Sequence, residues 1–203
     1  MMARIRLKDL RSLSVAVVHP PDANGQTILD QLGRIGCRTD HIWPPEKGLA
    51  SKVDVVFAGV FFDSQEQMKA MLRRAEKPAP AIIAVIDYEN PAMLELVLEL
   101  GAVAVTSKPV RSFGIMTNMV VARDCQQRQI DLQQKMAKLE KKLAGQKIIA
   151  KAKSILMEMH GFSEAAAFET IRKQAMSKRT SIEDMAQAII NANELLSGKP
   201  VDV

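Results

Sequence analysis

Cysteine is scarce in this chain of 203 residues, and so are long apolar runs. The two cysteines, Cys37 and Cys125, lie far apart without the spacing of a metal site, so the sequence predicts reduced thiols. No apolar run reaches the roughly 18 residues of a membrane-spanning helix, and the N-terminus lacks the pattern of a signal peptide. We therefore expect a soluble protein of the cytoplasm.

Signatures of enzymes are missing as well. No cluster of His, Cys, Asp or Glu has metal-ligand spacing, and there is neither a Ser-His-Asp pattern nor a phosphate-binding glycine loop. The sequence thus predicts a protein that is not an enzyme and has no cofactor. What it does contain is 47% hydrophobic residues, which is enough for a packed core.

The net charge of +5 is unevenly distributed along the chain. Residues 123–153 contain 9 basic and 3 acidic groups, whereas the segments on either side are nearly balanced or slightly acidic. Such an excess is typical of a polyanion-binding surface, but it is also typical of a solvated helix face. Charge alone leaves both interpretations open.

The first part of the chain alternates short apolar runs with helical patterns. Helical periodicity is strongest in the segments 25–36, 64–75 and 90–101, the last of which begins at an Asn-Pro pair suited to a helix start. Alternating β and α segments of this length predict an α/β domain with a five-stranded parallel sheet and helices on both faces. The predicted strands are residues 13–20, 37–43, 53–60, 80–87 and 102–109.

A long uninterrupted helical pattern follows. Between residues 118 and 150 there is no proline, and the one glycine is Gly145. Apolar residues recur there with the spacing of a coiled-coil seam, which predicts a dimerisation helix. The alternative is a single helix packed on its own domain. The convincing seam positions are Leu132, Met136, Leu139 and Leu143.

The C-terminal part contains three helical patterns that can pack as a small bundle. Ser163 is the expected N-cap of the second, and either Thr180 or Ser181 caps the third. Residues 197–203 are expected to be frayed. The residues that fit the bundle core are Leu156, Met157, Phe168, Ile171, Met185 and Ile189.

This C-terminal part resembles the ANTAR family of RNA-binding antitermination domains. The residues that match the family motif are Ala152-Lys153, Leu156-Met157, His160-Gly161, Ser163-Glu164, Ala167-Phe168, Ile171-Arg172, Met176, Asp184-Met185-Ala186 and Ile189-Ile190. The match is dense over this part of the chain, and it implies RNA binding there.

The whole chain resembles the AmiR-like transcription antiterminators, which also share the stretches "QLGRIGC", "WPP" and "VDVVF". The resemblance implies a flavodoxin-like pseudo-receiver (residues 1–117), a coiled-coil dimerisation helix (118–146), an ANTAR bundle (147–196) and a flexible tail (197–203). It also implies a homodimer that binds hairpin loops in the leader of a nascent mRNA. Control would come from a ligand-sensing partner protein that sequesters the regulator.

The first domain departs from response-regulator receivers at the residues that carry their chemistry. Receivers need an acidic pair after the first strand to hold Mg²⁺, but the chain has His19-Pro20-Pro21 there. The phosphoacceptor Asp is replaced by Gly59, and the expected Thr or Ser after strand four by Ile86-Asp87. Lys108 alone survives as a receiver remnant. Without a carboxylate nucleophile, the sequence predicts a receiver that does not accept phosphate.

Other polar residues near the strand ends offer no replacement. Asp54 begins its strand and so lies at the wrong end of the sheet, while Asp87 stands alone at the correct end. We interpret His19 as a loop residue and Lys108 as a residue that keeps its loop in place.

A positive groove in the ANTAR region is the predicted RNA-binding site. The acids Glu158, Glu164 and Glu169 are expected to lie away from it. Phe162 and Phe168 are the aromatic residues of this region, and with Phe168 assigned to the core, base recognition would rest mainly on hydrogen bonds. The predicted RNA contacts are Lys147, Lys151, Lys153, Arg172, Lys173, Lys178, Arg179 and Thr180.

Two other functions stay open from the sequence. In the first, the protein is a protein-interaction adaptor without RNA binding, and the basic stretch is a solvated coiled-coil face. In the second, it is a response regulator controlled by phosphorylation. RNA affinity and its dependence on salt distinguish the adaptor, and labelling by a phosphoryl donor distinguishes the response regulator.

Overall fold

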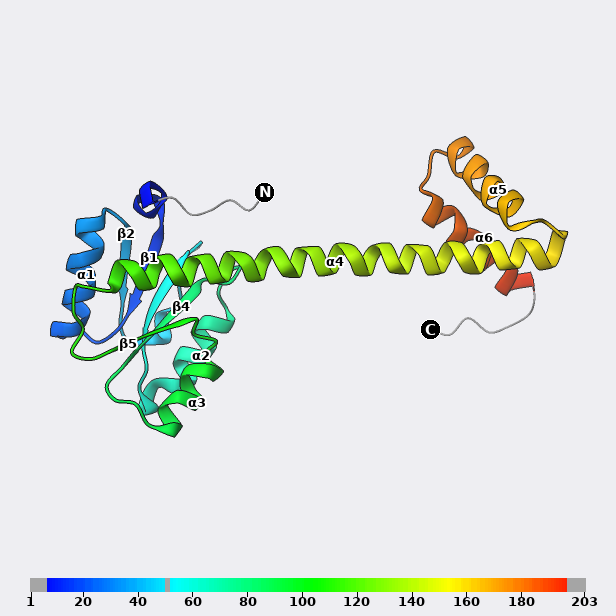
Figure 1. The fold of residues 1–203 in the computed structure, drawn as a ribbon. Helices are drawn as coiled ribbons and strands as arrows, with labels where there is room; N and C mark the ends of the chain where they lie inside the picture. The colour runs from blue at the N-terminus through cyan, green and yellow to red at the C-terminus, as the bar shows by residue number, and fades with distance from the viewer. Residues whose placement is uncertain (1–6, 50–51, 197–203) are drawn as a thin grey trace. The chain divides into compact units, whose positions relative to one another are not determined.

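The computed structural model describes residues 7–49 and 52–196. The chain divides into two compact units, Met1–Asp131 and Leu132–Val203 (Figure 1). The predicted flexible tail, residues 197–203, lies outside the described residues. In the part that is described, no helix is both long and apolar enough to cross a membrane.

The first unit is built on a five-stranded parallel sheet, which confirms the predicted α/β fold. Its strand order is β2-β1-β3-β4-β5, the order of flavodoxin-like folds. Strands β3 and β4 are buried along their whole length because helices cover both faces, and for this reason they read as continuous apolar runs. The strands are β1 (Ser14–Val18), β2 (Arg38–Ile42), β3 (Val55–Gly59), β4 (Ala81–Ile86) and β5 (Ala104–Ser107).

Two hydrophobic cores lie on opposite faces of this sheet (Figure 1). One core joins the sheet to α1 (Ala23–Ile35) and to the start of α4 (Ile115–His160). The other joins it to α2 (Gln65–Arg73) and α3 (Pro91–Glu99). Short 3-10 helices complete this unit; they are η1 (Leu7–Ser12), η2 (Pro45–Lys47) and η3 (Phe62–Ser64).

Helix α4 is continuous over 46 residues, so both predicted domain boundaries, at 117/118 and 146/147, fall inside it. Its first turns belong to the receiver: Met119 and Ala122 are fully buried in the core beneath the sheet. The side-chain amide of Asn118 also donates a hydrogen bond to the hydroxyl oxygen of Thr106 on β5 at 2.8 Å. The part of the helix with a mostly exposed surface follows Asp131.

The second unit packs the last turns of α4 against α5 (Glu164–Ser177) and α6 (Ile182–Leu196). Gly145 of α4 lies against α6, where an added Cβ would be 3.0 Å from Cγ of Glu183. Ser163 caps α5 as predicted, and of the two candidates for α6 the cap is Ser181, which accepts from the Asp184 amide at 2.9 Å.

The predicted bundle core was wrong at two positions, Met157 and Phe168. Their side chains are 39% and 36% exposed, respectively. The inner face of α5 is instead formed by Ala167, Ile171 and Ala175, which are fully or almost fully buried. Phe168 follows Ala167 directly, so its side chain is rotated about 100° away from that inner face.

Candidate functional site

The receiver site lies at the carboxyl ends of β1 and β3, where the strand order reverses and where open α/β sheets bind their ligands. His19 follows β1 and Gly59 ends β3, and these two strands are neighbours in the sheet. His19 lies in the loop after β1, as predicted, and its side chain is fully buried there.

The space beside Gly59 is already filled. A Cβ added at this glycine would lie 2.8 Å from Cδ2 of His19 and 2.8 Å from Cε2 of Phe61. Non-bonded carbon atoms in proteins do not approach this closely without displacement. An aspartate at position 59 therefore requires movement of both rings.

An aromatic cluster continues from this point. The ring of Phe61 meets His19 and Trp43 edge to face, with centroid distances of 5.7 and 5.6 Å. The Nζ atom of Lys108 lies 4.3 Å from the centre of the Phe61 ring and 2.8 Å from Oδ1 of Asp87. The lysine that would contact a phosphoryl group in a receiver is thus held by a carboxylate and a cation–π contact.

The surroundings of His19 favour its neutral form. Its Nδ1 lies 3.0 Å from the carbonyl oxygen of Pro20, which can only accept, so Nδ1 carries the proton. Its Nε2 is buried and has no hydrogen-bond partner among the described residues. Burial lowers the pKa of His19, and nearby Lys108 acts in the same direction. These effects outweigh the Pro20 hydrogen bond and the carboxylates of Asp22 and Asp87, which raise the pKa.

Sequence reasoning missed the roles of Phe61 and Trp43 in this cluster. The signal for Phe61 was available: it stands two residues after Gly59, at the edge of the sheet where His19 also emerges. The carboxyl ends of adjacent parallel strands lie at the same edge of the sheet. Rings that follow β1 and β3 can therefore meet there, beside Gly59, which has no side chain. Nothing in the sequence pointed to Trp43, which reaches the cluster from the loop after β2.

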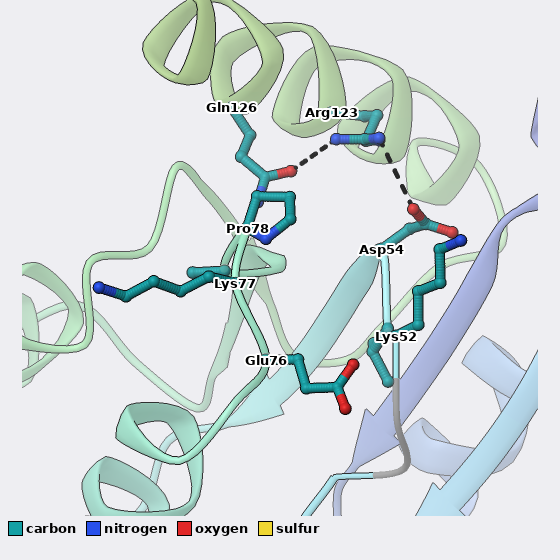
Figure 2. A pocket seen from close by; sticks show the side chains of 9 residues that line it. Lys52, Asp54, Glu76, Lys77, Pro78, Arg123 and Gln126 are labelled. Atoms are coloured by element: carbon teal, nitrogen blue, oxygen red, sulfur yellow. Dashed lines mark hydrogen bonds and ion pairs between the residues drawn. The ribbon is translucent and has the colours of Figure 1, made fainter. Parts of the chain in front are cut away.

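Asp54 lies at the opposite end of the sheet, as predicted. Its carboxylate accepts from the Ser14 amide at 2.9 Å and lies 3.6 Å from the Arg123 guanidinium of α4. Figure 2 shows Arg123 between Asp54 and Gln126, to which it donates at 2.8 Å. A cavity of about 390 Å³ opens here, and within its lining the pair of Asp54 and Arg123 joins α4 to the sheet. Its lining is Lys52, Val53, Asp54, Glu76, Lys77, Pro78, Ala79, Arg123 and Gln126.

The predicted dimer seam is exposed in the single chain. Its four side chains project from α4 with more than half of their surface accessible, although each is large and apolar. Their spacing of four, three and four residues places them on one side of the helix. The exposed fractions are Leu132 56%, Met136 60%, Leu139 66% and Leu143 55%.

The basic side chains of the second unit do not converge on one face of α4. Lys151 pairs with Glu194 of α6 at 2.8 Å, whereas Lys153 pairs with Glu164 of α5 at 2.5 Å. The two lysines therefore reach toward different helices.

The expected separation of acids from these basic groups was wrong at Glu164 and at Glu169. Glu169 lies 3.2 Å from Nε of Arg172, one turn along the same helix. The hydrogen bond from Lys153 lowers the pKa of Glu164, which keeps that carboxylate ionised. A phosphate group must compete with these carboxylates for the same cations.

The remaining predicted contacts lie near the turn between α5 and α6. Lys178 is the C-cap residue of α5, and Arg179 has a left-handed backbone with φ of 54°. Thr180 follows, with its hydroxyl 3.5 Å from Asp184. Lys147 and Lys173 are exposed on α4 and α5. These residues remain predicted RNA contacts.

Two family models match the chain, one for each part. The model described as "AmiR, N-terminal" matches residues 13–123, and the model of the ANTAR domain matches residues 137–190. The ANTAR match thus coincides with the last part of α4 together with α5 and most of α6.

Known proteins resemble the chain to different extents. The aliphatic amidase regulator of Pseudomonas aeruginosa is 34% identical over 98% of this chain and 99% of its own length. The transcriptional regulatory protein PdtaR of Mycobacterium tuberculosis is 24% identical over 68% of each chain. A response regulator structure from Thermotoga maritima aligns with 56% of this chain and 98% of its own at 17% identity, with a TM-score of 0.46.

Proposed function

Because the chain belongs to the AmiR family of regulators, with an AmiR N-terminal domain followed by an ANTAR domain, we propose that it is an RNA-binding transcription antitermination regulator. A dimer would hold hairpin loops in the leader of a nascent mRNA and prevent a terminator from forming. The main support is the ANTAR match, which coincides with the helical bundle of predicted RNA contacts. The proposed role is regulatory and not enzymatic, and its place is the cytoplasm, where that transcript lies.

Dimerisation through α4 is part of this proposal. Leu132, Met136, Leu139 and Leu143 form an exposed apolar stripe, and a second copy of the helix would bury it. We place the coiled coil within residues 118–146, and its exposed part begins at Leu132.

Control of the regulator is proposed to come from a protein and not from phosphate. The receiver centre has Gly59 in place of an acceptor carboxylate, and His19 and Phe61 leave no space for one. Lys108 is paired with Asp87 and covers Phe61. A ligand-sensing partner that sequesters the regulator until its inducer binds would supply the missing switch.

The RNA surface is proposed to comprise the exposed basic residues of α4, α5 and the turn before α6. Exposed ion pairs such as Arg172 with Glu169 are weak, so phosphate oxygens can displace the carboxylates. Because phosphate contacts release counterions, affinity should fall steeply with salt.

Sequencing of the RNA that co-purifies with the full-length protein tests the class of function. We expect a recurrent motif of paired hairpins, and we expect the double variant Arg172→Glu/Lys178→Glu to lose both this RNA and antitermination in a leader–reporter assay. The matched control, Arg73→Glu/Lys77→Glu, makes the same charge change on the receiver surface and should retain both. Wild-type protein that enriches no RNA would favour the adaptor function.

Phosphoryl transfer is tested separately. Incubation with Mg²⁺ and a small-molecule phosphoryl donor, followed by intact-protein mass measurement, should show no added mass. A stable phosphorylated species at Asp87 would contradict control by a partner protein alone.

A further inference from the structure

Phe168 lies outside the bundle core and exposes an aromatic surface. Its ring is 36% exposed on α5, although burying a Phe side chain contributes about 1.5–3 kcal/mol to folding. The two aromatic residues in positions 132–203 are Phe162 and Phe168. Phe162 packs against the bundle core with its ring 5.4 Å from that of His160, which leaves Phe168 as the more accessible flat surface.

The ion pair between Lys153 and Glu164 locates this ring within the bundle. It joins α4 to α5, so the faces of the two helices that carry these residues lie toward each other. Residues four apart share a helix face. Phe168 is one turn after Glu164, and Met157, 39% exposed, is one turn after Lys153. The junction of the two helices therefore presents apolar surface next to a cation.

A second basic residue lies one turn further along α5. Arg172 follows Phe168 by one turn on the same face of α5, and its side chain is half exposed. An accessible aromatic ring between two basic side chains is the arrangement that binds a nucleotide: the ring stacks on the base, and the cations contact the flanking phosphates. Both cations are paired with carboxylates in the free protein, and RNA phosphates would replace these carboxylates.

We propose that Phe168 stacks on an unpaired base of the hairpin loop and that Lys153 and Arg172 hold the phosphates on either side of that base. Base pairs in a helical stem do not expose their flat faces, so this contact selects a loop over a duplex. The inference rests on the RNA-binding function proposed above and adds to it the residue that contacts a base. It also replaces the expectation that base recognition depends mainly on hydrogen bonds.

The test uses the full-length protein and an RNA hairpin selected by the wild-type protein from a pool of stems with randomised loops. Phe168→Leu should bind the selected hairpin about tenfold or more weakly. Phe168→Tyr, which keeps the ring, should bind nearly as wild type does. The control Met176→Leu changes another exposed apolar side chain of α5 and should have no effect.

Abasic substitution along the loop identifies the stacked base. At one loop position, removal of the base should weaken binding by the wild-type protein as strongly as Phe168→Leu weakens binding to the intact hairpin. On that abasic RNA, Phe168→Leu should bind nearly as well as the wild-type protein.

Equal affinity of Phe168→Leu and wild type for the intact hairpin would overturn the stacking contact and leave RNA binding in place. A pool from which the wild-type protein selects nothing would overturn the proposed function itself. A change in dimer mass for Phe168→Leu would instead assign the ring to contact with a second copy, and would also overturn stacking.

Discussion

The imidazole of His19 occupies the space into which a side chain at Gly59 would project, because an added Cβ would lie only 2.8 Å from its Cδ2 atom. The ring cannot easily move away. Its Nδ1 is held by the Pro20 carbonyl at 3.0 Å, and the carbonyl of His19 itself lies 2.9 Å from Nε2 of His41. A carboxylate at position 59 would therefore meet a ring that is held in place.

Gly59→Asp should lower stability without creating a phosphoacceptor. The new carboxylate would be buried against His19 and Phe61, and overpacking together with an unpaired buried charge costs about 2–4 kcal/mol. Denaturant unfolding measures the loss, and mass spectrometry after treatment with a phosphoryl donor should detect no adduct. The control is Gly33→Asp in α1, where nothing lies within 4 Å of an added Cβ. A Gly59→Asp protein as stable as this control would contradict the steric argument.

The stability of the receiver should fall as the pH is lowered through the range of histidine titration. The pKa of His19 is lowered from 6.5 in the folded state, so below that value the unfolded chain binds more protons than the folded one. The contribution of neutral His19 is complete above about pH 6.5 and is lost as the pH falls toward the lower folded pKa. Unfolding free energies measured between about pH 7.5 and 5.5 report this slope.

Two variants, His19→Gln and its control His160→Gln, test whether His19 causes this pH dependence of stability. The first removes the buried imidazole and should flatten the slope, whereas the second removes an exposed imidazole of the other unit and should leave the slope unchanged. If His19→Gln keeps the wild-type slope, another group is responsible for it.

Leu139→Asp should weaken dimerisation by several kcal/mol. It puts a charge into the proposed apolar seam, where the partner helix offers no compensating group. Light scattering over a range of concentrations gives the dissociation constant. The control Gln134→Asp places the same charge five residues earlier, on the outward side of the helix, and should leave the dimer intact. Dimers of unchanged mass for Leu139→Asp would place the interface elsewhere.

Glu164→Gln should strengthen RNA binding by roughly two- to fivefold. In the free protein Lys153 is paired with Glu164, and the amide competes less strongly with an RNA phosphate for that ammonium group. Glu158→Gln removes one negative charge from an exposed position of α4 and serves as the control for the general change in charge. Equal affinity gains in both variants would show that Lys153 does not contact RNA.

The strands of the α/β part and the starts of helices in both units could be predicted from sequence because their signals are local. Buried parallel strands such as Val55–Gly59 and Ala81–Ile86 read as unbroken apolar runs, and Asn90 and Ser163 mark helix starts through hydrogen bonds to amides only three residues away. The missing acceptor is equally visible, because Gly59 has no side chain to ionise.

The ion pairs of the helical bundle could not be predicted in this way. Lys151 and Lys153 are two residues apart and both belong to a basic stretch, yet one meets Glu194 and the other Glu164. Helical periodicity shows that they point in different directions, but it does not show which helix covers each face.

Sequence alone thus determined which elements form, in which order, and that Gly59 stands where a receiver has its acceptor carboxylate. Each of these depends on residue type and short-range spacing. The tertiary structure decided what fills the vacated site and which apolar residues the bundle buries. His19 and Phe61 follow different strands and meet only when the sheet forms. On α5, either Ala167 or Phe168 fits the helical period beside Ile171, and close helix packing places the small Ala167 inside and leaves the ring of Phe168 exposed.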